Sequence, residues 1–218
     1  MNETNRSATE IFGILLAAGE SSRMGKMKQL LDYKGRSFTY NALDGFIHAG
    51  IKTIIVVLGH EYDLMKRHIN EYRPPECLKP HNYEIITARN EIYKAGQFSS
   101  IKCGISTFLQ KKSIDFYAGF MLQLIDRPLV TLETFKAVKD GFDTDRGRIV
   151  IPSYNMRRGH PACFPKKVMG DVLKLDANTG SLKDILNSNS SIITHINVHD
   201  EGIIRNIDTI EEYEKIKF

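Results

Sequence analysis

The stretch LLAAGESSRMGKMKQLL, residues 15–31, begins as an apolar run and continues after Gly19 as a loop of small, polar and basic residues. A turn that only reverses the chain needs about two to four residues, whereas this loop has ten, residues 19–28. Backbone N–H groups in such a loop can wrap a chain of phosphates while cations neutralise its charge. The composition is equally compatible with a solvated basic loop. The loop contains two glycines, two hydroxyls and three cations: Gly19, Gly25, Ser21, Ser22, Arg23, Lys26 and Lys28.

Two common phosphate-binding motifs do not fit this loop. A Walker A loop has four residues between its glycines and then Lys followed by Ser or Thr. Here five residues separate Gly19 from Gly25, and Met27 follows Lys26. The Rossmann motif G-x-G-x-x-G cannot be placed on these glycines either. Any phosphate site in this loop is therefore of another kind.

Short apolar, β-branched runs alternate with segments of helical periodicity along the rest of the chain. This alternation predicts the α/β class, with a three-layer α/β/α sandwich around a mostly parallel (mixed), Rossmann-like sheet. In such sheets ligands bind beyond the carboxyl ends of the strands. We expect a flexible N-terminal tail over 1–10 and a single domain over 11–218. Strands are predicted at 11–18, 53–59, 83–88, 118–125, 148–154 and 192–198, and helices at 38–49, 61–72, 99–112, 131–141, 166–175, 180–188 and 209–216.

The overall composition excludes several classes of function. The 218-residue chain is 42% hydrophobic and 26% charged, with a net charge of +4. Its basic residues are scattered along the chain rather than gathered in a run, so we expect no nucleic-acid partner. Its longest apolar stretches are about eight residues, short of the ~20 that span a bilayer, so we expect no membrane partner. Three distant cysteines without a CxxC pair argue against a zinc knuckle or disulfide framework. These features predict a soluble, cytoplasmic protein.

Residues 16–28 match L-A-A-G-x-S-x-R-M-G-x-x-K, which resembles the signature of the nucleotidyltransferase superfamily, the MobA-like NTP transferases. The resemblance implies that the loop holds a nucleoside triphosphate, with Arg23 and Lys28 as catalytic residues that offset its charge. The nucleotide-binding residues that it implies are Leu16, Ala17, Ala18, Gly19, Glu20, Ser21, Ser22, Arg23, Met24, Gly25, Lys28, Gly96 and Ser100.

A second feature of the family is an aspartate at the end of a later apolar strand. Here MLQLIDRPLVT places Asp126 at that point, with Ile125 where the family usually has Gly or Val. A carboxylate suits Mg²⁺, which takes oxygen ligands and few protein carboxylates. The resemblance implies that Asp126 is catalytic and binds the metal. Without that context, a strand-end Asp is more often a helix cap or turn residue.

The segment NEIYKAGQFSSIKCGI, residues 90–105, resembles the N-x-x-x-x-x-G-x-x-x-S segment of cytidylyltransferase-like members. There Gly96 and Ser100 would approach the base and ribose. Hydroxyls at a helix start suit such contacts. Ser99 is open to two interpretations, contact with the acceptor or a simple helix N-cap.

The segment RRGHPACFP, residues 157–165, resembles the R-G-H-P-x-x-F segment of the molybdenum cofactor cytidylyltransferase branch. The resemblance implies that Gly159 and His160 lie near the acceptor. A His before Pro on a loop is otherwise structural or solvated. His160 is a poor candidate for a general base, because a phosphate monoester is largely ionised near neutral pH.

The segment GIIRNIDTIEEYEKI, residues 202–216, resembles the closing motif G-x-x-x-x-I-D-T-P-E-D. Asp208 would supply the second metal ligand, unless it caps the last helix, with Asn206 as the alternative ligand. Ile210 and Glu212 replace the usual Pro and Asp, a difference that concerns capping rather than chemistry.

The whole resemblance implies nucleotidyl transfer with Mg²⁺, or Mn²⁺ in its place, as cofactor. Ala18 favours CTP, because L-A-A-G members mostly use pyrimidine nucleotides, and the R-G-H-P segment favours molybdopterin as the phosphorylated acceptor. A recipient molybdoenzyme is the implied protein partner. The alternatives are a cytidylyl- or uridylyltransferase acting on methylerythritol phosphate or a sugar phosphate, and a non-catalytic chaperone that binds the nucleotide or cofactor.

Overall fold

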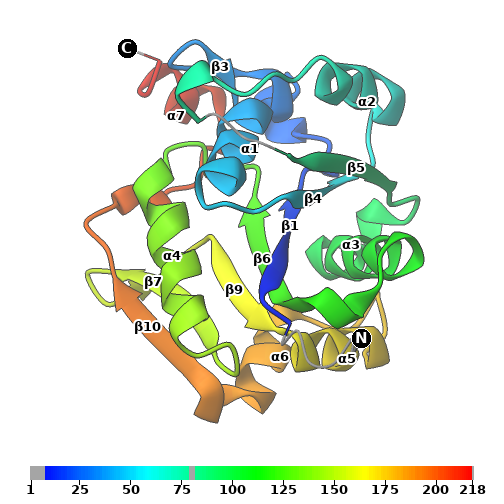
Figure 1. Ribbon diagram of the computed structural model, residues 1–218. Coiled ribbons are helices and arrows are strands. Elements are labelled where there is room, and N and C mark those ends of the chain that lie inside the picture. The colour runs from blue at the N-terminus through cyan, green and yellow to red at the C-terminus, as the bar shows by residue number, and fades with distance from the viewer. Residues whose placement is uncertain (1–7, 79–81, 218) are drawn as a thin grey trace.

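The computed structural model describes residues 8–78 and 82–217, and it contains the predicted alternation of strands and helices (Figure 1). Within these residues one sheet has the strand order β10-β7-β9-β6-β1-β4-β5, with β8 paired to β7. A separate hairpin joins β2 (Asp32–Tyr33) to β3 (Arg36–Ser37). The strands of the main sheet are β1 (Glu10–Leu16), β4 (Thr53–Leu58), β5 (Glu84–Arg89), β6 (Tyr117–Leu124), β7 (Ile149–Tyr154), β8 (Arg157–Arg158), β9 (Ala162–Pro165) and β10 (Ile193–Asn197).

The sheet is mixed and mostly parallel, as predicted. β6, β1, β4 and β5 pair in parallel, and so do β7 and β10. β9 runs antiparallel to both of its neighbours, β6 and β7. The sequence predicts no strand at 162–165, because this run of four residues ends in a proline and is too short to show a period.

Helices cover both faces of the sheet and complete the three-layer sandwich (Figure 1). Alternate residues of β1 explain its continuous apolar run: Phe12 and Ile14 pack in the core on one face, and Ile11 and Leu15 pack on the other. α3 (Gln97–Lys111), α5 (Lys166–Lys174) and α6 (Leu182–Ser188) contribute to the first core. α1 (Phe38–His48), α2 (Tyr62–Asn70) and α4 (Leu132–Thr144) contribute to the second.

Element boundaries differ from the predicted ones by a few residues. The helix predicted from 99 begins at Gln97, so Ser99 and Ser100 lie in its first turn. The last helix, α7, is shorter than predicted and spans Ile210–Glu214. β1 begins at Glu10, inside the tail predicted for 1–10, and residues 1–7 of that tail lie outside the described residues. In the part of the chain that is described, no helix is long and apolar enough to cross a membrane.

The carboxyl ends of β1 and β6 lie side by side, so the loops that follow these two strands begin next to each other. Leu16 pairs with Leu124 across the two strands, and the backbone N–H of Ile125 then donates to the Leu16 carbonyl. The N–H of Ile207 donates to the Asp126 carbonyl at 2.8 Å. These bonds bring the loop after β1, the loop after β6 and the segment before α7 to one edge of the sheet.

Candidate active site

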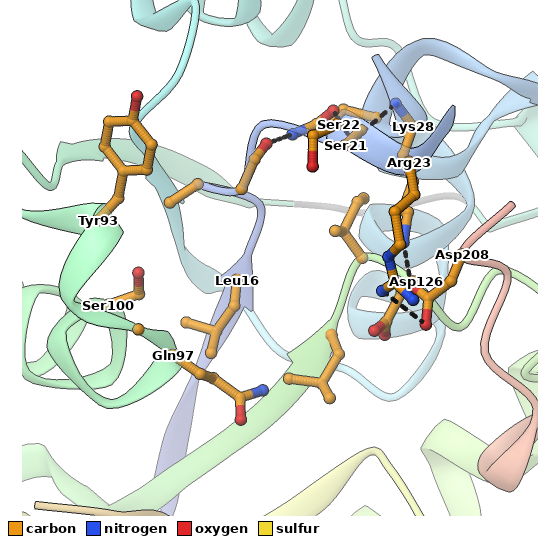
Figure 2. Close-up of a pocket in the computed structure, with 16 residues that line it drawn as sticks. Leu16, Ser21, Ser22, Arg23, Lys28, Tyr93, Gln97, Ser100, Asp126 and Asp208 are labelled. Carbon is orange, nitrogen blue, oxygen red and sulfur yellow. Dashed lines mark hydrogen bonds and ion pairs between the residues drawn. The ribbon is translucent and has the colours of Figure 1, made fainter. Parts of the chain in front are cut away.

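A cavity of about 310 Å³ opens at the carboxyl ends of β1 and β6 (Figure 2). It is the place where four separate parts of the sequence meet: the glycine loop, the start of α3, the end of β6 and the segment before α7. Its lining residues are Leu16, Ala18, Gly19, Ser21, Ser22, Arg23, Lys28, Gln29, Tyr93, Gly96, Gln97, Ser100, Leu124, Ile125, Asp126 and Asp208.

The glycine loop has a defined conformation built from two short 3₁₀ turns, η1 (Ser22–Met24) and η2 (Lys28–Leu30). Ser21 and Gly25, on either side of η1, both have left-handed backbone angles, with φ of 53° and 62°. Met24 is buried in a small core beside α7, which anchors the middle of the loop. The loop is therefore tied to the protein body rather than free in solvent.

Gln29 fixes the loop from inside, although none of the sequence motifs includes it. Its side chain is 1% exposed, and Nε2 donates to the carbonyls of Ala17 (3.0 Å) and Gly19 (2.9 Å). The Ser21 hydroxyl donates to Gln29 Oε1 at 3.4 Å and accepts from the Lys28 backbone N–H at 3.1 Å. The sequence feature that could have indicated a role for Gln29 is its polar amide directly before the apolar pair Leu30–Leu31.

The cations of the loop meet a carboxylate from the far end of the chain. Lys28 Nζ lies 2.6 Å from Asp208 Oδ1, and Arg23 Nη2 lies 3.5 Å from Asp208 Oδ2. Burial alone would raise the pKa of Asp208, but its hydrogen bond with Lys28 and the charges of Lys28 and Arg23 hold that pKa below its ordinary value. Figure 2 shows both cations directed at Asp208 from the loop.

The Asp208 carboxylate faces the cations of the loop and does not cap α7, because another residue caps that helix. Thr209 is the N-cap, and its hydroxyl accepts from the Glu212 N–H while the Glu212 carboxylate accepts from the Thr209 N–H at 3.0 Å. The capping interpretation of Asp208 is therefore not what the structure has. Glu212 serves capping, as the sequence predicted.

Asp126 lies beside Asp208 in the cavity and has an unsatisfied oxygen. Its Oδ1 is buried and has no hydrogen-bond partner among the described residues. Burial raises the pKa of Asp126, the charges of Lys28 and Arg127 oppose that rise, and Asp208 adds to it. A buried oxygen without a donor, next to a second carboxylate, fits a hard divalent cation such as Mg²⁺ or Mn²⁺.

These two carboxylates are few for a metal site. Within residues 8–78 and 82–217, no group of three or more His, Cys, Asp or Glu side chains is placed to hold an ion. A metal at this site would take its other ligands from water and from phosphate oxygens. That pattern is typical of Mg²⁺ bound together with a nucleotide.

The opposite wall of the cavity is organised by Asn90, a second residue whose role the sequence analysis did not specify. Its side chain is 4% exposed, and Nδ2 donates to the hydroxyls of Ser99 and Ser100, both at 2.9 Å. The Ser99 hydroxyl also donates to the Gly96 carbonyl at 2.7 Å, and Ser99 is not among the lining residues. Ser100 and Gly96 do line the cavity, as does Gln97.

Glu20 joins the two walls. The Tyr93 hydroxyl donates to Glu20 Oε1 at 2.9 Å, and Lys94 Nζ lies 3.0 Å from the same oxygen. The hydrogen bond and charge of Lys94, together with the Tyr93 hydroxyl, hold the pKa of Glu20 below its usual value. Of the implied nucleotide-binding residues, Ala17, Glu20, Met24 and Gly25 do not line the cavity, and the others do.

Gly159 and His160 lie in a second, smaller cavity of about 120 Å³, not in the first one. Arg127, the residue after Asp126 of the first cavity, also lines the second one. Burial and the charge of Arg127 lower the pKa of His160 to about 4. A Cβ at Gly159 would lie 2.3 Å from the Ile203 carbonyl oxygen, so only glycine fits there. The His160–Pro161 peptide bond is cis.

Residues 13–193 match the model of the MobA-like NTP transferase domain family. The chain belongs to this family. The match spans the glycine loop, Asp126 and the His160 segment, and the family is one of nucleotidyltransferases. The resemblance inferred from the sequence motifs is thereby confirmed at the level of the family.

Similar proteins cover almost the whole chain. Nicotine blue oxidoreductase of Paenarthrobacter nicotinovorans is 25% identical over 210 residues, 93% of this chain and 94% of the relative. The structure of Rv0371c from Mycobacterium tuberculosis H37Rv has a TM-score of 0.73 at 24% identity and covers 95% of this chain and 97% of its own. A nucleotidyl transferase from Methanothermobacter thermautotroptrophicus, Mth528, has a TM-score of 0.74 at 18% identity over 95% and 96% of the two chains. These structures support the fold.

The Mycobacterium tuberculosis protein Rv0371C also has a structure in complex with manganese. That structure has a TM-score of 0.69 at 21% identity, and the alignment covers 97% of this chain and 99% of the other.

Proposed function

We propose that this protein transfers CMP from CTP to the terminal phosphate of molybdopterin, or of its molybdenum-loaded form, and releases pyrophosphate. The observation that carries the proposal is the meeting of the signature loop with Asp126 and Asp208 at one cavity. Membership of a nucleotidyltransferase family supports the reaction class. CTP and molybdopterin rest on Ala18 and on the R-G-H-P segment of residues 158–161.

The glycine loop would bind the triphosphate. Its backbone N–H groups and the Ser22 hydroxyl would donate to phosphate oxygens, and the Ser21 hydroxyl would do so on release from Gln29 Oε1. Arg23 and Lys28 would neutralise the charge of the phosphates. Ser100, Gly96 and Gln97 on the opposite wall would contact the ribose and base.

Asp126 and Asp208 would hold Mg²⁺ or Mn²⁺, and the manganese complex of the Mycobacterium tuberculosis protein supports divalent metal use. When bound, the metal would withdraw charge from the phosphate oxygens at which the reaction occurs. Asp208 itself would hold Lys28 and Arg23 at the end of the cavity that the phosphates enter.

In the proposed reaction a phosphate oxygen of the acceptor forms a bond to the α-phosphorus of CTP, and the bond from that phosphorus to the pyrophosphate oxygen breaks. The acceptor phosphate is already ionised near neutral pH, so the residues need not remove a proton. Catalysis then consists of positioning and charge neutralisation. Gly159 and His160 would contact the acceptor through the second cavity, and a His160 with a pKa of about 4 would do so as a neutral ring. Ser99 is the weakest of the acceptor candidates, because its hydroxyl is already bonded.

Residues 11–218 would act as one domain in the cytoplasm, where free cysteines remain reduced. The protein would pass its product to a recipient molybdoenzyme. The relative named nicotine blue oxidoreductase raises a competing function, a redox reaction, because a cationic loop can also hold the phosphates of a dinucleotide.

Pyrophosphate release tests the proposal. The protein is incubated with Mg²⁺, each of CTP, GTP, UTP and ATP, and molybdopterin, methylerythritol phosphate or a sugar phosphate in turn. We expect release with CTP and molybdopterin, and Asp126→Ala should reduce it at least ~100-fold, equivalent to about 3 kcal/mol. Asp63→Ala, on the exposed side of α2, is the matched control.

Three outcomes would overturn the proposal. Release only with a sugar phosphate or methylerythritol phosphate would exclude molybdopterin as acceptor. Nucleotide binding without pyrophosphate release would favour the chaperone. Oxidation of a nicotinamide dinucleotide by a dye substrate, with no pyrophosphate release from any pair, would favour the redox function.

A further inference from the structure

The two carboxylates of the cavity differ in what neutralises them. Asp208 is held by Lys28 Nζ at 2.6 Å and by Arg23 at 3.5 Å, whereas Asp126 Oδ1 has no hydrogen-bond partner. Asp126 therefore has an oxygen to which no donor is bound, whereas both oxygens of Asp208 already face a cation.

Lys28 and Arg23 are not equivalent in this arrangement. The Lys28 side chain is 10% exposed, and that of Arg23 is 72% exposed. The Lys28 backbone is also fixed by its bond to Ser21 Oγ. A surface pair such as Arg23–Asp208 is worth little, whereas a buried pair leaves an uncompensated charge when one partner is removed. Lys28 is therefore the cation that chiefly neutralises the Asp208 carboxylate.

The cavity has no excess of negative charge without a metal. Asp126 and Asp208 contribute two negative charges, which Lys28 and Arg23 on the same lining offset with two positive ones, and the charge of Arg127 also acts on Asp126. A divalent cation that arrives alone meets no net attraction, and it must separate Lys28 from Asp208. A cation that arrives with a triphosphate brings anionic oxygens to which Lys28 can move.

We propose that Lys28 occupies the cation position on Asp208 in the nucleotide-free protein and moves to the phosphates when the metal and nucleotide arrive together. This inference rests on the proposed function. Lys28 thereby acts as a positioning residue before it acts on the substrate. It prevents the protein from binding a divalent cation stably without its nucleotide, and it couples metal binding to nucleotide binding.

The test measures binding of Mn²⁺ alone, by the loss of its free electron paramagnetic resonance signal, without any turnover. Removal of the ammonium leaves the two carboxylates opposed only by the exposed Arg23 and by Arg127, so Lys28→Met should bind Mn²⁺ at least ~10-fold more tightly than the unaltered protein. Lys28→Arg, which keeps the charge, should stay weak. Lys26→Met removes the same charge from the exposed part of the same loop and should change nothing.

Further measurements separate failure of this inference from failure of the proposed function. Lys28→Met with Asp208→Asn should lose the gain in Mn²⁺ affinity. Where Lys28→Met does not fold, as judged by thermal unfolding, Lys28→Gln gives the same comparison. Equal Mn²⁺ affinity in the Lys28 variants and the unaltered protein would overturn the inference, even if a CTP analogue that cannot release pyrophosphate promotes Mn²⁺ binding to both. If Mn²⁺ binds to none of them with or without the analogue, the proposed metal site fails as well.

Discussion

The side-chain amide of Gln29 donates to the backbone carbonyls of Ala17 and Gly19, at 3.0 and 2.9 Å. One buried residue near the end of the glycine loop thus holds the point where β1 ends and the loop begins. Because the Ser21 hydroxyl donates to the same amide, the loop keeps its shape without a ligand. A preorganised loop loses little conformational entropy when it binds a triphosphate.

Gln29→Glu should therefore weaken both folding and nucleotide binding. The substitution keeps the shape of the side chain but replaces a double donor by a carboxylate oxygen that faces two carbonyls. We expect a loss of about 1–3 kcal/mol in the free energy of unfolding, which lowers Tm by about 2–4 °C per kcal/mol. Thermal unfolding and nucleotide titration measure the two effects. Gln110→Glu, on the exposed face of α3, is the control, and equal behaviour of the two variants would show that the Gln29 bonds do not hold the loop.

Much of the site was accessible to sequence reasoning because parallel strands place their carboxyl ends at one edge of the sheet. The glycine loop follows β1 and Asp126 follows β6, its neighbour in the sheet, so their proximity follows from the fold class. The pairing of Lys28 with Asp208 does not, because 180 residues separate them. In the sequence, only the order of the family's motifs places Lys28 and Asp208 in one site.

Other features lay outside what the sequence could predict. Gln29 and Asn90 act through hydrogen bonds to a few neighbouring groups, and a lone Gln or Asn shows no periodic signal. β9 is buried among β6 and β7, but four residues ending in Pro165 are too few to distinguish a strand from a loop. Placement of Gly159 and His160 in a separate cavity depends on that strand.

Asn90→Ala should disturb the wall opposite the glycine loop. The Asn90 amide donates to Ser99 and Ser100 and accepts from the Ile92 N–H at 3.1 Å. Its removal takes away the buried amide that Ser99 and Ser100 share and lets the Ser100 hydroxyl rotate, so we expect a loss of about 1–3 kcal/mol in stability and weaker nucleotide binding. Urea unfolding and calorimetric titration measure these effects. Asn70→Ala, at the exposed end of α2, is the control, and unchanged nucleotide affinity in Asn90→Ala would place the base elsewhere.

Asp126→Asn should make the ligand-free protein more stable while it weakens catalysis. Burial raises the pKa of this carboxyl group, which means that its ionised form is disfavoured in the folded protein. A neutral amide of the same shape removes that cost, and Tm at neutral pH should rise by about 2–4 °C for each kcal/mol gained. Differential scanning calorimetry without added metal measures the change. A lower Tm would mean that the ionised Asp126 has a stabilising partner.

His160 should make the protein less stable in mild acid. Burial and then the charge of Arg127 lower its pKa from 6.5 to about 4, against the bond that its Nδ1 makes with the Leu122 carbonyl. Between these two values the unfolded chain binds a proton at this position and the folded protein does not. Stability is therefore fully present above pH 6.5 and is lost as the pH falls toward 4, by about 2 kcal/mol between pH 7 and pH 5.

His160→Gln isolates this contribution, because the variant lacks the titrating ring and keeps every other histidine. The pKa values of His68 and His195 are also lowered by burial, so part of the acid sensitivity is common to both proteins and cancels in the comparison. Urea unfolding at pH 7 and pH 5 should show a loss of stability about 2 kcal/mol smaller in the variant. An equal loss in the two proteins would mean that the His160 ring accepts a proton in the folded state, and the second cavity would then carry an additional positive charge in mild acid.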